Sequence, residues 1–226
     1  MVLILRGVFC QTLDNIPAIK DEPYCASIHD HVERIEFQLA GYKKINMVSL
    51  AEYVNLMSTW EEFTIDILKF ETYQHYLGKK KLAKKTLASI IDGSENDIEK
   101  VKKISNYLGK TLEWNKKYWM YKNQNLSDLI KNKSGNSAEI NLFFVSLLRE
   151  AGLDAHPALT STKSNGKVTT IYPMRTQFNN VLAAVKIKDQ YQLFDAIHPR
   201  YPFDLLAPEN LNGKAFLLKN QKKPFG

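Results

Sequence analysis

Between residues 58 and 112 the apolar residues recur every three or four positions, which is the spacing of one helical face. Ser58 and Thr59 are each followed three residues later by a glutamate, the signature of a capping box at a helix start. Phe63 and Ile67 then fall on one face of the predicted helix.

Two more helices are predicted before residue 112, the first over residues 82–91. The second starts at Ser94, with Asp97 in the third helical position. Its apolar face repeats at helical spacing and consists of Ile98, Val101, Ile104, Tyr107 and Leu108.

A different pattern covers the segment from residue 137 to about 150, where apolar residues cover almost the whole helical circumference. A helix that is apolar all round is buried on every side rather than laid on a surface. Asn136 is a suitable N-cap for this helix, and Glu139 in the third position completes a capping box.

After Gly152 the pattern changes to short apolar runs that favour strands. Asn165-Gly166 predicts a hairpin turn, and a second tight turn is predicted at Asp189-Gln190. The predicted strands cover residues 155–162, 168–172, 181–187, 191–194 and 215–218. Helices followed by a run of strands predict the α+β class, with a buried central helix and an antiparallel sheet.

Residues 1–57 differ from the rest of the chain. Strands are predicted at residues 2–13 and 35–39, with prolines between them that disfavour helix. This segment has too few apolar residues for a core of its own. We therefore divide the chain into an extended β segment, residues 1–57, and a main domain, residues 58–226.

The composition of the chain mainly excludes certain classes of protein. The chain has 226 residues, 44% of them hydrophobic, which indicates a globular protein, and no apolar run approaches a membrane span. The apolar run at the N-terminus is too short for the apolar region of a secretory signal. Localisation therefore stays open, with an exported or periplasmic parent protein as one alternative. Cys10 and Cys25 form no metal-ligand pattern, so neither a metal nor a cofactor is predicted.

The net charge is +7. Acidic residues interrupt the basic stretches and no nucleic-acid-binding motif accompanies them, so solvated helix faces are the favoured interpretation over nucleic-acid binding. The lysine clusters lie at residues 79–81, 84–85, 102–103, 116–117 and 222–223.

Candidate chemistry begins at Ser137, in the first turn of the buried helix. Free backbone N–H groups and the helix dipole favour negative charge there, a location that suits a thiolate. Taken alone, Ser137 is better explained as a second capping residue, because serine is common at helix starts.

Four segments together resemble the transglutaminase-like, papain-related domain of bacterial multidomain proteins. They are residues 135–141 (GNSAEIN), 147–155 (LLREAGLDA), 177–181 (QFNNV) and 193–196 (LFDA). The resemblance runs from about residue 58 to 218, and it implies a papain-like core. Part of residues 15–39 resembles the end of the β-domain that usually precedes this one, so other domains of a parent protein are expected partners.

The resemblance also implies positions for a Cys-His-Asp triad, which read Ser137, Asn180 and Asp195 here. A serine is a poor nucleophile without a base, and an amide does not accept a proton near neutral pH. We therefore expect a catalytically inactive binding or scaffold module. The alternative is an acyl-transfer enzyme, a peptidase or amidase, that uses Ser137 with His198 or Lys133 as base.

The segment before the buried helix supplies candidate binding residues. Trp114, Tyr118, Trp119 and Asn136 are predicted to line a cleft for a peptide or a glycan. Ordinary core packing of the aromatic residues is the equally weighted alternative.

Overall fold

The computed structural model describes residues 41–46, 49–55 and 59–219. β1 (Gly41–Asn46) and β2 (Ser49–Asn55) form an antiparallel pair, which the sequence pattern did not predict. The strands predicted at residues 2–13 and 35–39 lie outside the described residues, and the proposed boundary at residue 57 stays a prediction.

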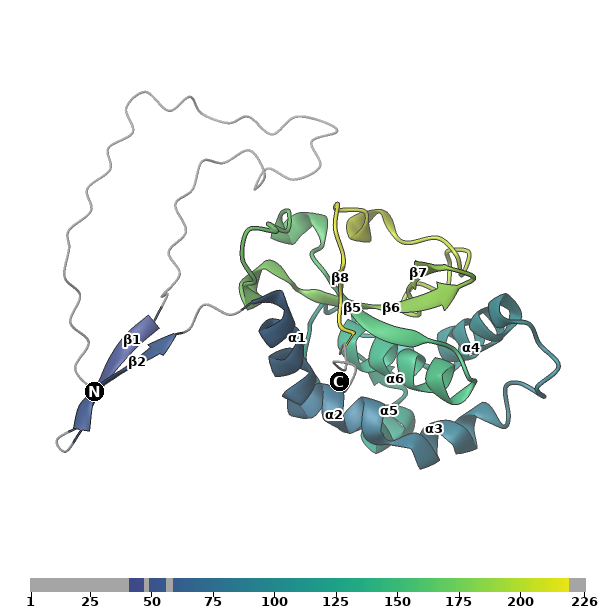
Figure 1. Ribbon diagram of the computed structural model, residues 1–226. Helices are drawn as coiled ribbons and strands as arrows, with labels where there is room; N and C mark the ends of the chain where they lie inside the picture. Colours follow the sequence, from purple (N-terminus) through teal and green to yellow (C-terminus); the bar gives the residue numbers. More distant parts are fainter. Residues whose placement is uncertain (1–40, 47–48, 56–58, 220–226) are drawn as a thin grey trace, which may run out of the picture.

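Helices dominate the next part of the chain, as predicted (Figure 1). They are α1 (Trp60–Lys69), α2 (Glu71–Gly78), α3 (Lys80–Leu87), α4 (Asp97–Thr111), α5 (Leu126–Asn132) and α6 (Ser137–Glu150).

The predicted helix starts are right for α1 and α6 and wrong for α4. Thr59 caps α1: its hydroxyl oxygen accepts from the N–H of Glu62. The Glu62 carboxylate accepts from the N–H of Thr59, which completes the predicted capping box. α4 is capped by Asn96 with Glu99, two residues later than predicted. The hydroxyl of Ser94 instead donates to Asp92 at 2.6 Å, because a short polar side chain readily closes a local turn.

Four strands form an antiparallel sheet in the order β7-β6-β5-β8. The turn between β6 and β7 lies at residues 188–189, one residue earlier than predicted, and Lys188 adopts a left-handed φ of 56° there. The strands are β5 (Ala155–Thr160), β6 (Asn180–Ile187), β7 (Gln190–Phe194) and β8 (Phe216–Leu217).

The strand predicted at residues 168–172 is absent from the described fold. A short 3₁₀ turn, Lys163–Asn165, replaces the expected hairpin, and β5 pairs with β6 and β8 instead. Side chains satisfy the backbone of this segment; the N–H of Thr169, for example, donates to Gln177 Oε1 at 3.0 Å. β8 lies near the end of the domain in sequence and pairs with the edge of β5. The alternation of apolar and polar residues in the 168–172 segment could not show that this edge is already occupied.

α6 lies at the centre of the fold, between the sheet and the other helices (Figure 1). It contacts β5 and β6 on one side and α2, α3 and α4 on the other. Every residue from Ser137 to Leu148 is buried, which confirms the prediction of a helix buried on all sides. Each fully buried leucine or phenylalanine of this helix contributes about 1.5–3 kcal/mol to folding. The α+β fold is confirmed.

Candidate functional site

The start of α6 is built by a capping box and a close backbone approach. Asn136 accepts a hydrogen bond from the N–H of Glu139, and Glu139 Oε2 accepts one from the N–H of Asn136, both at 2.9 Å. Gly135 precedes the cap, where a β-carbon would lie 2.5 Å from Leu129 Cδ1 and 2.9 Å from Glu139 Oε2. Glycine is therefore favoured here, because a β-carbon would force the side chain of Leu129 or the carboxylate that holds the helix start to shift.

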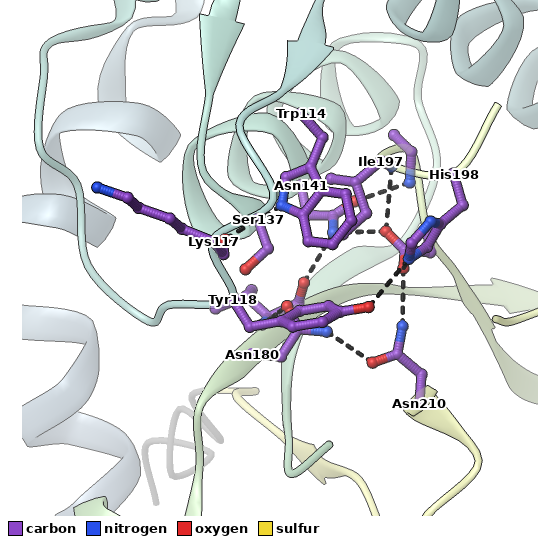
Figure 2. Close-up of polar contacts among 12 residues, drawn as sticks. Trp114, Lys117, Tyr118, Ser137, Asn141, Asn180, Ile197, His198 and Asn210 are labelled. Carbon is purple, nitrogen blue, oxygen red and sulfur yellow. Dashed lines mark hydrogen bonds and ion pairs between the residues drawn. The ribbon is translucent and has the colours of Figure 1, made fainter. Parts of the chain in front are cut away.

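Ser137 follows the cap and has no exposed surface. Its hydroxyl donates to the carbonyl of Trp119 at 3.1 Å and accepts from the N–H of the same residue at 3.0 Å. Its own N–H donates to the carbonyl of Lys117 at 3.1 Å (Figure 2). Because Asn136 already serves as the N-cap, Ser137 has a different role and joins the helix start to the aromatic segment before it.

Asn180 and Asp195 belong to one chain of buried side-chain hydrogen bonds (Figure 2). Asn180 Nδ2 donates to Asn210 Oδ1 at 2.8 Å, and Asn210 Nδ2 donates to Asp195 Oδ2 at 2.9 Å. Asn141 Nδ2 on α6 donates to Asp195 Oδ1 at 2.9 Å. Through these amides, α6, the first residue of β6, the residue after β7 and the 3₁₀ helix Pro208–Asn210 are joined at one point.

Burial raises the pKa of the Asp195 carboxyl above its ordinary value, and its hydrogen bonds oppose that shift. Asn141, the N–H of Ile197 and Asn210 supply these bonds, and His198 acts in the same direction through its charge. His198 Nε2 lies 4.0 Å from Asp195 Oδ2 and 3.1 Å from the hydroxyl of Tyr118. Burial also raises the pKa of the Tyr118 hydroxyl.

The four predicted binding residues separate into three environments. Asn136 is fully buried. Its Oδ1 accepts from the N–H of Glu139 in the helix cap, and its Nδ2 donates to the carbonyl of Tyr121. Tyr118 contacts His198, whereas the Trp119 side chain is 51% exposed. Trp114 packs against Tyr118, with ring centroids 4.8 Å apart, and lines a groove. A shared binding site for the four residues stays a prediction.

The groove has a volume of about 620 Å³, and His198 is among the residues that line it. Trp114 and His198 are in edge-to-face contact there, with ring centroids 5.0 Å apart (Figure 2). Ser137, Asn180 and Asp195 are absent from the residues that line it. A smaller cavity of about 110 Å³ beside the groove is lined by both Asp195 and His198, so His198 connects the groove to Asp195.

Sequence reasoning missed two members of the polar network, Asn141 and Asn210. Asn141 carried a usable signal, because a polar residue in a helix buried on all sides must find a buried partner. It also lies one turn after Ser137, on the same helical face. Asn210 carried no such signal, since it reaches the site from a loop beyond β7.

The profile of the Transglutaminase-like superfamily matches residues 84–196, half of the chain. The matched range contains Ser137, Asn180 and Asp195. The chain therefore belongs to the transglutaminase-like superfamily, as its sequence motifs predicted. No curated protein matches it.

Two solved structures are similar to this chain. A putative protease from Parabacteroides distasonis is 14% identical, with a TM-score of 0.49, over 67% of this chain and 29% of that one. A putative cysteine protease from Cytophaga hutchinsonii is 19% identical, with a TM-score of 0.37, over 60% and 42% of the two chains. This chain spans less than half the length of either structure.

Two features are absent from the part of the chain that the structure describes. None of the helices in that part of the chain has the length and apolar character needed to cross a membrane. In the same residues, no three histidine, cysteine or acidic side chains come together as metal ligands would.

Proposed function

We propose that this transglutaminase-like domain is catalytically inactive and acts as a binding or scaffold module for a peptide or glycan partner. One observation carries the proposal: the Ser137 hydroxyl is buried and exchanges both of its hydrogen bonds with the backbone of Trp119. A nucleophile must instead be reached by substrate and hydrogen-bonded to a base.

The residue at the expected base position supports the same proposal. Asn180 is an amide, which cannot accept a proton near neutral pH, and its Nδ2 group donates to Asn210. Loss of either the nucleophile or the base in a serine protease lowers turnover roughly a million-fold. One such loss would suffice to abolish useful acyl transfer.

The second candidate function is acyl transfer by Ser137 with an unusual base. Its support is the pair of His198 and Asp195, whose nearest atoms are 4.0 Å apart. Against it, His198 Nε2 contacts the hydroxyl of Tyr118 rather than that of Ser137. Lys133 is exposed and lines the groove, which does not include Ser137.

The decisive measurement is ammonia release and amine transfer with a glutamine-containing peptide, using the purified chain. We expect the wild type and Ser137→Ala to be indistinguishable from buffer. Ser146→Ala is the matched control, because it removes another buried hydroxyl from the same helix. Turnover that vanishes in Ser137→Ala but persists in Ser146→Ala would overturn the proposal, and a further loss in His198→Ala would identify the base.

A further inference from the structure

The groove of about 620 Å³ is strongly basic. Lys110, Lys116, Lys133 and Arg200 line it, and Glu113 is the one acidic residue in the lining. These residues come from the end of α4, the strand β3 (Glu113–Trp114), the end of α5 and the loop after β7. The fold thus concentrates cations from three stretches of the chain, residues 109–116, residue 133 and residues 197–201.

These four cations are unpaired within the part of the chain that the structure describes. Elsewhere in that part basic side chains do find acids: Lys122 pairs with Glu71 at 2.7 Å, and Lys103 pairs with Glu95. No salt bridge between described residues involves the groove cations. Their charge is therefore available to a ligand.

Two of the lysines are held in an unfavourable backbone conformation. Among the described non-glycine residues, Lys116 with φ 64° and Lys133 with φ 55° are two of three in the left-handed region. A residue with a β-carbon costs about 1 kcal/mol or more there relative to glycine. Both positions therefore carry a charged side chain where the backbone alone favours glycine.

The groove also has an aromatic surface. Trp114 and Tyr201 line it together with His198, and Tyr201 is exposed. Aromatic faces accept aliphatic stems, whereas lysine and arginine bind carboxylates. Glu113 can accept hydrogen bonds from the backbone N–H groups of a peptide, which a phosphate chain does not offer.

We propose that this groove binds an acidic peptide segment, with glutamate or aspartate carboxylates on the four cations and their aliphatic stems on the aromatic surface. Its volume falls within the range of ligand pockets, roughly 300–1,000 Å³, which holds a few residues. The inference rests on the proposed binding role, and it locates binding beside the buried Ser137 rather than over it.

The test is isothermal titration of the full chain with N-acetylated, C-amidated tetraglutamate at low ionic strength. The groove variant is Lys116→Gln, Lys133→Gln and Arg200→Gln combined. Its control combines Lys81→Gln, Lys84→Gln and Lys85→Gln, which removes the same charge from the exposed face of α3. We expect affinity to fall at least about tenfold in the groove variant and less than about twofold in the control.

Other outcomes overturn the inference. Equal losses in both triple variants would mean that net charge, not the groove, attracts the peptide. Equal affinity for tetraglutamine would exclude carboxylate recognition, and tighter binding of oligothymidylate or inorganic phosphate would assign the groove to another ligand. Absence of tetraglutamate binding would also refute it.

Circular dichroism checks that each variant is folded. If the triple groove variant is unfolded, the single variant Arg200→Gln, whose change lies in a loop, takes its place in the titration. Turnover by the wild type would refute the proposed inactivity without touching the groove. Failure of binding would refute the groove and leave the turnover result standing.

Discussion

Ser137 illustrates how its surroundings decide what a single side chain can do. The first turn of α6 provides the electrostatic environment of a nucleophile, yet the serine there is saturated by the backbone of Trp119. Asn180 is likewise used within a buried amide network. Both residues can therefore serve the stability of the fold at positions where the sequence motifs predicted a nucleophile and a base.

Glu95 provides a pH-dependent prediction. Lys103 and the N–H groups of Asp92 and Gly93 contact its carboxylate, and they lower its pKa from 4.5 to about 2. A carboxyl whose pKa is lower in the folded than in the unfolded state stabilises the fold above the unfolded pKa. That contribution disappears as pH falls from about 4.5 toward 2.

The measurement is urea unfolding of wild type and Glu95→Gln between pH 7 and pH 2.5. We expect the wild type to be the more stable at pH 7, with the difference shrinking below pH 4.5. Glu61→Gln, at an exposed position on α1, should show little difference at either pH. A Glu95→Gln deficit that stays constant over the whole range would contradict the assignment.

The start of α6 does more than begin a helix, because Glu139 also fixes the loop before it. Its Oε1 accepts from the N–H groups of Asn123 at 2.7 Å and Gln124 at 2.9 Å, while Oε2 holds the cap. This loop continues from the segment whose backbone contacts Ser137. One buried carboxylate therefore couples the helix start to the segment beside the candidate site.

Glu139→Gln should destabilise the protein by about 1–3 kcal/mol, because the new NH₂ group must face backbone donors in a buried site. Glu62→Gln is the matched control, since the exposed Glu62 occupies the same capping-box position in α1. Glutamine is tolerated at that position of the box, so a change of less than about 0.5 kcal/mol is expected there. Chemical denaturation monitored by circular dichroism measures both, and equal effects would argue against a special role for Glu139.

The described hydrophobic core runs from Phe63 to Leu218. α1 reaches across to the C-terminal strand, where Trp60 and Phe216 lie with ring centroids 4.5 Å apart. Phe63 and Phe178 complete this aromatic cluster, with centroids 5.9 Å apart. The two described ends of the main domain are thus joined through one core, and the boundary near residue 57 stays a prediction.

A chain that begins at Ser58 should therefore fold on its own. We expect cooperative thermal unfolding with a midpoint within about 4 °C of the whole chain, equivalent to roughly 1 kcal/mol or less for a domain of this size. Scanning calorimetry compares the two chains. A large drop in the midpoint, or loss of the cooperative transition, would show that residues 1–57 complete the core.

The sequence by itself determined the parts of this protein that depend on local spacing. Helical periodicity and the capping residues identified α6 and its burial, and short apolar runs identified β5 and β6. The order of helices and strands gave the α+β class, and the motifs around Ser137, Asn180 and Asp195 gave the superfamily.

Only the tertiary structure decided which distant groups meet. Trp119 contacts Ser137 across 18 positions, and Asn210 contacts Asn180 across 30. β8 occupies the sheet edge that the 168–172 segment was expected to fill. The basic groove is assembled from three separate stretches of the chain. Local patterns record helical period and capping, whereas such partners are set by how the whole chain closes around α6.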